Sequence, residues 1–208
     1  MARKFIWKSP LLEKGDKLFR SDCSDMRNNA ILDYEESHRF AVYNLGYFDA
    51  AELLVMSYIK EERAKDLLVY PIIYLYRHSI ELKLKEFIWS LNYCLNQNTN
   101  FPTNHDLKNL WVEFIKLYSK KDSKNILKKS FTDAAIIIKQ LSDGDSFSMA
   151  YRYPLDKKGN LSKKPTLLNV RNFALLMLKL KRFLDAISEK INNYKFTASE
   201  SYADGIYA

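Results

Sequence analysis

Ten consecutive residues, from Tyr76 to Lys85, hold the side chains best suited to chemistry. Arg77, Glu81 and Lys85 are spaced four apart, so a helix places all three on one face, with His78 beside them. Most of their neighbours are apolar, and buried charges cost several kcal/mol unless they are paired. One interpretation is a structural ion pair between Arg77 and Glu81. The other is a polar site in which Arg77 binds an anion and His78 transfers protons.

The chain has three histidines, His38, His78 and His105, and they stand in separate segments. Thr103 and Asp106, on either side of His105, have the spacing of a helix-capping box. His105 is therefore either part of that cap or a second proton carrier. His38 has charged neighbours in the first turn of a predicted helix, which indicates a surface position.

The motifs that usually hold cofactors and metals are absent from the sequence. It contains no GxxxxGK[ST], GxGxxG or GxSxG pattern for nucleotides or nucleophiles. It also lacks an HExxH sequence and paired CxxC sequences, the usual zinc ligands. We therefore expect no cofactor and no metal ion.

Basic residues are concentrated in residues 151–182, where nine Lys or Arg residues stand against one acid, Asp156. Such a segment attracts phosphate backbones or acidic partner proteins, or it simply forms a solvated face. Within it, Tyr151 and Tyr153 flank Arg152, an arrangement that suits stacking on nucleobases and equally suits packing over the end of a helical bundle. The candidate RNA-binding residues are Tyr151, Arg152, Tyr153, Lys157, Lys158, Lys163 and Lys164.

Five predicted helices must position these side chains. Apolar residues recur at intervals of three and four in residues 34–65, 67–95, 103–118, 122–141 and 167–194. The second of these helices is apolar around most of its circumference, so we place it at the centre. Residues 145–165 break the helical pattern and predict a short extended piece or hairpin. The expected fold is all-α, an antiparallel up-and-down bundle with two long central helices.

We expect one domain, in which residues 1–33 form an N-terminal arm, 34–194 the bundle and 195–208 a C-terminal tail. With 47% hydrophobic and 28% charged residues among 208, the composition is that of a globular protein. Five Gly and five Pro residues are few for a turn-rich β fold. The longest uncharged apolar run, 67–76, is about half of the ~20 residues that a membrane span needs. The sequence therefore predicts a soluble, cytoplasmic protein with no membrane contact.

Three short motifs together resemble those of a known group of bacterial proteins. They are RHSIELKLK at 77–85, HDLKNLW at 105–111 and RYP at 152–154. In this order, over roughly residues 35–190, they resemble uncharacterised proteins of the HEPN-like type. The resemblance implies a helical bundle, commonly a homodimer, and a frequent role in RNA cleavage, toxin–antitoxin modules or defence against phage.

Active HEPN-like proteins are metal-independent ribonucleases with an Arg that holds the scissile phosphate and a His that moves a proton. Arg77 and His78 match the first two positions of their motif. The positions for the second His hold Leu82, Lys83 and Leu84, so the chain departs from the pattern. Two readings remain open. Either His78 or His105 takes the missing role, or the protein is a non-catalytic relative that binds RNA, a nucleotide or a cognate protein.

Overall fold

A computed structural model describes residues 14, 17–19, 21, 23–32, 36–60, 65–97, 100–145, 148–164 and 166–206. At 36–39, 65, 127 and 201–206 only the backbone is described. The chain forms two compact units, Met1–Tyr34 and Glu35–Ala208. Among the described residues of the first unit, Cys23–Asn28 form a short 3₁₀ helix with no buried residue.

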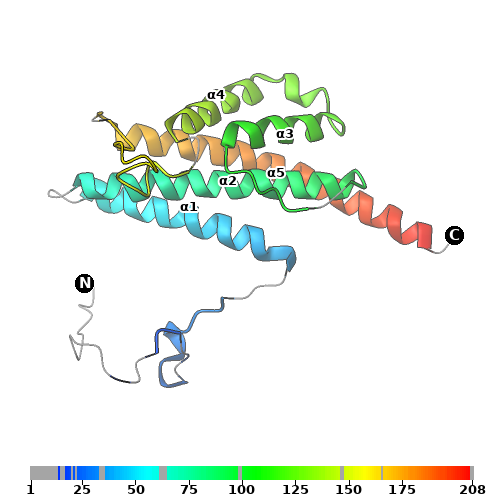
Figure 1. Ribbon diagram of the computed structural model, residues 1–208. Helices are drawn as coiled ribbons and strands as arrows, with labels where there is room; N and C mark the ends of the chain where they lie inside the picture. Colours follow the sequence, from blue (N-terminus) through cyan, green and yellow to red (C-terminus); the bar gives the residue numbers. More distant parts are fainter. Residues whose placement is uncertain are drawn as a thin grey trace. The chain divides into compact units, whose positions relative to one another are not determined.

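The described residues of the second unit form five α-helices. They are α1 (Glu36–Lys60), α2 (Val69–Cys94), α3 (Leu107–Ser119), α4 (Lys129–Gly144) and α5 (Val170–Ile206). Figure 1 shows α1, α2 and α5 as long neighbouring helices, with the shorter α3 and α4 packed over them. Helix α2 contacts α1, α3 and α5, so it is the central element. The predicted all-α bundle is confirmed.

The core follows the apolar spacing of the sequence. On α2, Ile72, Ile80 and Leu84 are at most 2% exposed, and each lies four or eight residues from the next. A stripe on α5 is buried in the same way. Its members are Val170, Ala174, Met177, Leu180, Leu184, Ile187 and Ile191. None of the described helices is both long and apolar enough to cross a membrane.

Several helix boundaries differ from the sequence prediction. Helix α4 begins at Lys129 rather than near 122, and a short 3₁₀ helix, Asn125–Leu127, precedes it. Helix α5 continues to Ile206, twelve residues past its expected end at Tyr194. The apolar stripe ends there, but no Pro follows and the first Gly is Gly205, so nothing stops the helix. Helix α3 begins at Leu107 rather than near 103, because the side chain of Asp106 itself is the N-cap and accepts the first free N–H groups of the helix.

Residues 148–164 form the hairpin-like segment that the alternating pattern near 145–165 predicted. One antiparallel bridge joins Leu155 to Leu161. The turn between them holds Gly159 at φ +81°, a left-handed conformation that glycine adopts without strain. Oδ1 of Asp156 accepts the backbone N–H groups of Lys158 and Asn160, which closes the turn. We call residues 148–164 the basic hairpin.

Candidate functional site

The guanidinium of Arg77 is the centre of a buried hydrogen-bond network. Its Nη1 donates to Oε2 of Glu81 at 3.0 Å, one turn along α2. Its Nη2 donates to the carbonyl oxygen of His105 at 2.8 Å, and its Nε to that of Asp145 at 3.1 Å. Arg77 is 0% exposed. One side chain therefore joins α2 to the segment before α3 and to the end of α4.

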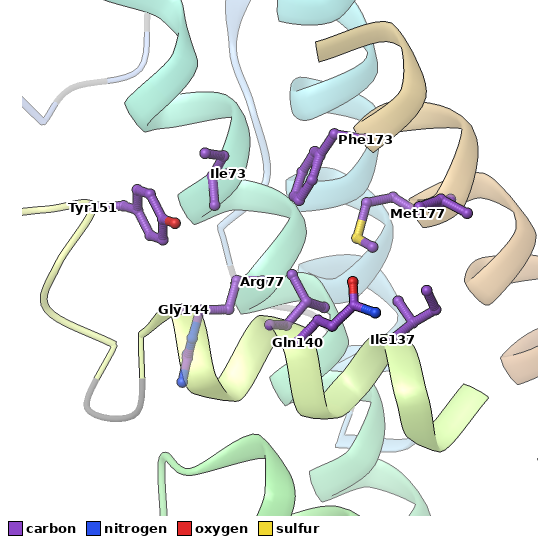
Figure 2. A pocket seen from close by; sticks show the side chains of 10 residues that line it. Ile73, Arg77, Ile137, Gln140, Gly144, Tyr151, Phe173 and Met177 are labelled. Carbon is purple, nitrogen blue, oxygen red and sulfur yellow. The ribbon is translucent and has the colours of Figure 1, made fainter. Parts of the chain in front are cut away.

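Figure 2 shows Arg77 at the edge of a small cavity between α2, α4 and α5. The cavity has a volume of about 80 Å³, enough for a few water molecules. Ile73, Phe173 and Met177 supply apolar walls, and Gln140 and Tyr151 supply polar groups. Because the guanidinium already donates to three protein acceptors, it is not presented to an external phosphate. This geometry corresponds to the structural interpretation of Arg77.

Glu81 is the acceptor that the other charged groups share. Its side chain is 1% exposed, and its Oε1 lies 3.0 Å from Nζ of Lys85 and 2.8 Å from Nδ1 of His105. Burial alone would raise the pKa of Glu81, but hydrogen bonds from His105 and Lys85 and the charges of Lys85 and Arg77 lower it below its usual value. Glu81 is therefore a buried, ionised carboxylate at neutral pH.

His105 connects this buried carboxylate to solvent. Its side chain is 65% exposed although its Nδ1 contacts Glu81. A carboxylate at Nδ1 selects the tautomer with the proton on that atom, which leaves Nε2 to exchange protons with a ligand. A base oriented by an acid in this way is a common element of catalytic sites.

His78 lies on α2, three residues before Glu81, and is half-buried among aromatic rings. Its ring stacks on Tyr74, with centroids 5.6 Å apart and planes at 10°, and meets the edge of Tyr47 at 4.5 Å. Burial lowers the pKa of His78; Glu81 opposes the shift, and the positive charges of Lys85, Arg152 and Arg77 add to it. His78 is therefore neutral at pH 7.

Arg152, in the basic hairpin, contacts the same tyrosine ring as His78. Its guanidinium lies over the ring of Tyr74 at 5.5 Å and near that of Tyr153 at 5.7 Å, and its Nε donates to the carbonyl oxygen of Ser148 at 2.6 Å. Because Tyr74 also stacks on His78, the arginine and the histidine share one aromatic neighbour. Arg152 is exposed, unlike Arg77.

The other residues predicted to bind RNA divide into two groups. Tyr151 and Lys163 are partly buried; Nζ of Lys163 contacts the carbonyl oxygen of Gly144 and lies 4.5 Å from the centre of the Tyr151 ring. These two residues pack the hairpin against the end of α4. The second group is exposed to solvent. It comprises Tyr153, Lys157, Lys158 and Lys164.

Asp145 is a functional candidate that sequence reasoning missed. It follows the last residue of α4 and is 5% exposed, and its Oδ1 accepts the N–H groups of Met149 and Ala150 at 2.8 and 3.0 Å. Its Oδ2 is buried without a hydrogen bond, 3.9 Å from Nε of Arg77. Asp145 thus holds the turn that precedes Arg152. An aspartate just after a helix-ending Gly is the only signal of this role in the sequence.

The structure links several of the residues selected from the sequence through Glu81 and Tyr74. Glu81 stands between His105, which it contacts, and His78, whose charge it influences. The side chain of His38 lies outside the described residues, so its expected surface position stays a prediction. In the described parts of the chain, no three His, Cys, Asp or Glu side chains are grouped in a way that could hold a metal ion.

No protein-family model, no curated protein and no solved structure matches this chain. The resemblance to HEPN-like proteins stays a prediction, and the function has to be argued from the geometry of the site.

Proposed function

We propose that this protein binds RNA and cleaves it without a metal ion, using His78 and His105 to move protons. The observation that carries the proposal is the position of Glu81. Its buried carboxylate holds Nδ1 of His105 while the ring remains 65% exposed, and the neutral His78 lies one turn away beside Arg152. Two proton carriers and an exposed guanidinium are the groups that cleavage of an RNA backbone requires.

The reaction we assign to these groups is an internal transesterification. His78, neutral at pH 7, takes the proton of the ribose 2′-hydroxyl, and the 2′-oxygen attacks the adjacent phosphorus. The bond from phosphorus to the 5′-oxygen breaks, and protonated His105 gives its proton to that oxygen. The products are a 2′,3′-cyclic phosphate and a 5′-hydroxyl, so atoms and protons balance.

Arg152 is the phosphate-binding residue of this proposal. In the HEPN-like motif that role belongs to the arginine at the position of Arg77, but Arg77 is fully buried and bound to three protein groups. Arg152 is exposed and lies over Tyr74, next to His78. A guanidinium there is able to neutralise the charge that develops on the phosphate oxygens.

The proposal includes a homodimer, formed with a second copy of the chain. Leu45, Leu53 and Met56 on α1 are 47%, 66% and 51% exposed. They follow one another at eight and three residues, so they lie on one face of the helix. An exposed apolar face of this kind is typical of a subunit contact. We expect a homodimer by light scattering at about 10 μM, a concentration at which a stable pair stays associated, and a monomer for Leu53→Glu.

The experiment that tests the catalytic proposal is cleavage of end-labelled RNA in EDTA. We expect His78→Ala and His105→Ala each to lower the rate by about 10²-fold or more, the usual contribution of a proton-transfer group. His38→Ala is the matched control, since it removes a histidine from another segment. No cleavage by the unaltered protein, cleavage only with added Mg²⁺, or full activity in both variants would each disprove the proposal.

A non-catalytic RNA-binding module is the second candidate function. The exposed lysines of the basic hairpin favour it, since they are available for phosphate contacts whether or not the histidines act. In that case RNA binds but stays intact, and His78→Ala leaves the affinity unchanged. The HEPN-like resemblance would place either activity in a toxin–antitoxin or phage-defence system.

A further inference from the structure

A large cleft lies between the end of α4 and the basic hairpin. Its volume is about 880 Å³, within the range of small-molecule binding sites, whereas the cavity beside Arg77 is about 80 Å³. Figure 1 shows the hairpin segment, in yellow, next to α4. One wall consists of the last residues of α4 and Asp145, and the other of residues 149–163 of the hairpin.

The acids that line this cleft are engaged by the protein itself. Asp143 forms an ion pair with Lys139. Oδ1 of Asp145 accepts the N–H groups at the start of the hairpin, and Asp156 accepts those of the hairpin turn, which lowers the pKa of Asp156. The carboxylates are therefore tied into the structure of the cleft walls.

Two of the lysines that line the cleft, unlike its acids, are not engaged by other protein groups within the described chain. Lys157 and Lys158 line it and are exposed, and their ammonium groups form no ion pair or hydrogen bond within the described chain. Lys163 reaches the carbonyl oxygen of Gly144 instead. Two free ammonium groups in a concave site are suited to an anion.

Apolar side chains supply the rest of the surface. Met149, Ala150 and Leu155 line the cleft, and Leu155 is 49% exposed. A ligand that uses both the lysines and this surface needs an anionic group and a flat apolar body. A nucleotide has both, with its phosphate and its base. An acidic peptide would use the lysines and leave the apolar wall exposed to water.

The walls of the cleft are linked to the candidate catalytic residues through the protein chain and its hydrogen bonds. Met149 and Leu155, on its wall, stand three residues before and after Arg152, whose guanidinium lies beside His78 over Tyr74. Asp145, also on its wall, is joined through Arg77 to His105. The residues of the cleft walls thus adjoin, along the chain and through Arg77, the residues to which cleavage is assigned.

We propose that this cleft binds one unpaired nucleotide of the RNA, next to the phosphate that Arg152 holds. The base packs against Met149 and Leu155, and the flanking phosphate contacts Lys157 and Lys158. This inference rests on the proposed function and adds its substrate class, single-stranded RNA. A base in a duplex is stacked and paired, and moving it into the cleft requires unstacking, which disfavours double-stranded substrates.

The test measures binding of a short single-stranded RNA, and of the same strand annealed to its complement, at several salt concentrations. A 2′-O-methyl group at each ribose blocks the attacking oxygen and so prevents cleavage during the measurement. We expect single strands to bind at least tenfold more tightly than the duplex. The double variant Lys157→Ala/Lys158→Ala should reduce the slope of log affinity against log salt by about 1.4, as expected for two lost phosphate contacts to a single strand.

Two further variants separate the apolar wall from general charge effects. Leu155→Ser should weaken single-strand binding by about tenfold, because the base loses an apolar contact, and should leave the salt slope unchanged. Lys120→Ala/Lys121→Ala removes the same charge from exposed residues outside the cleft and should leave the slope unchanged. Equal affinity for duplex, displacement of RNA by a polyglutamate peptide as effective as by RNA itself, or equal slopes for the two lysine pairs would overturn the inference.

The results also distinguish failure of the cleft from failure of the proposed function. If His78→Ala abolishes cleavage but the Lys157/Lys158 and Leu155 variants bind RNA normally, the cleft inference is wrong and the nuclease proposal stands. If the unaltered protein never cleaves RNA but the cleft variants lose single-strand binding, the catalytic proposal is wrong and the cleft inference stands.

Discussion

Positively charged side chains are buried and hydrogen-bonded in the network around Arg77, whereas those of the basic hairpin include lysines exposed to solvent. In the network, Arg77 and Lys85 are at most 3% exposed, and protein atoms accept their hydrogen bonds. In the hairpin, Lys157 and Lys158 face solvent. A buried cation without its partner is costly, whereas an exposed one contributes little to stability and remains free to bind.

This difference shows that residue type and motif position do not assign a role. Arg77 matches the phosphate-binding position of the HEPN-like motif, yet its hydrogen bonds hold three segments of the bundle together. Arg152 does not match that phosphate-binding position, yet it is exposed beside His78. Burial and partners separate the two arginines, and both properties depend on residues distant in the sequence.

The largest expected effect is on stability, from Arg77→Ala. The change leaves the buried carboxylate of Glu81 without its arginine and leaves two carbonyl oxygens without donors. We expect the free energy of unfolding to fall by about 3–5 kcal/mol in denaturant titrations. The matched control is Arg152→Ala, which should change it by less than about 1 kcal/mol because Arg152 is exposed. If the two variants had similar stability, the buried Arg77 would contribute no more to stability than the exposed Arg152.

Apolar replacements within the network should have the next largest effect on stability. Arg77→Met with Glu81→Leu removes one ion pair but leaves the ammonium of Lys85, 3% exposed, without its carboxylate. Adding Lys85→Met removes that charge too, so the triple variant should be more stable than the double one by about 1–3 kcal/mol. Denaturant midpoints at constant m-value provide the measurement. A triple variant that is less stable than the double would show that Lys85 does not depend on Glu81.

Sequence patterns predicted the helices better than their ends. The spacing of apolar residues located all five α-helices and the central place of α2, because burial of one face determines a helix. The end of α5 was wrong, since its last twelve residues continue a helix without an apolar stripe. No apolar period marks such an extension.

The candidate site was predictable only where its contacts are local. The four-residue spacing indicated the Arg77–Glu81 contact, which lies within a single helix. The contact of Glu81 with His105 spans 24 residues, and that of Arg77 with Asp145 spans 68. These contacts depend on how α3 and α4 pack against α2, which spacing along the sequence does not contain.

Acidification should destabilise the folded protein in two separate pH ranges. The pKa of His78 is lowered from 6.5, so the unfolded chain takes up its proton first, and stability falls as the pH drops below about 6.5 until the folded-state pKa is reached. The pKa of Glu81 is also lowered, so its contribution is present above its usual value and is lost as the pH falls through the lower folded value.

Unfolding titrations across these two ranges, for the unaltered protein and for His78→Gln, measure the effect. The variant should lose the pH dependence below 6.5 and keep the one at lower pH. Lys157→Ala, in the basic hairpin, is the control and should leave both unchanged. An identical profile for His78→Gln would mean that His78 titrates alike in the folded and unfolded chain.

The smallest expected effect tests whether the two regions interact where they meet, at Arg152 and His78. The positive charge of Arg152 is one cause of the lowered pKa of His78, after burial. Arg152→Gln keeps a polar side chain of similar length but removes the charge, so the pKa of His78 should rise toward 6.5. Proton NMR of the His78 ring measures this shift, which should be a fraction of a pH unit because Arg152 is exposed and water screens its charge. Lys157→Ala removes an equal charge from the same hairpin and should leave the resonance unchanged. If Arg152→Gln also leaves it unchanged, Arg152 does not act on His78 and cannot share a phosphate with it.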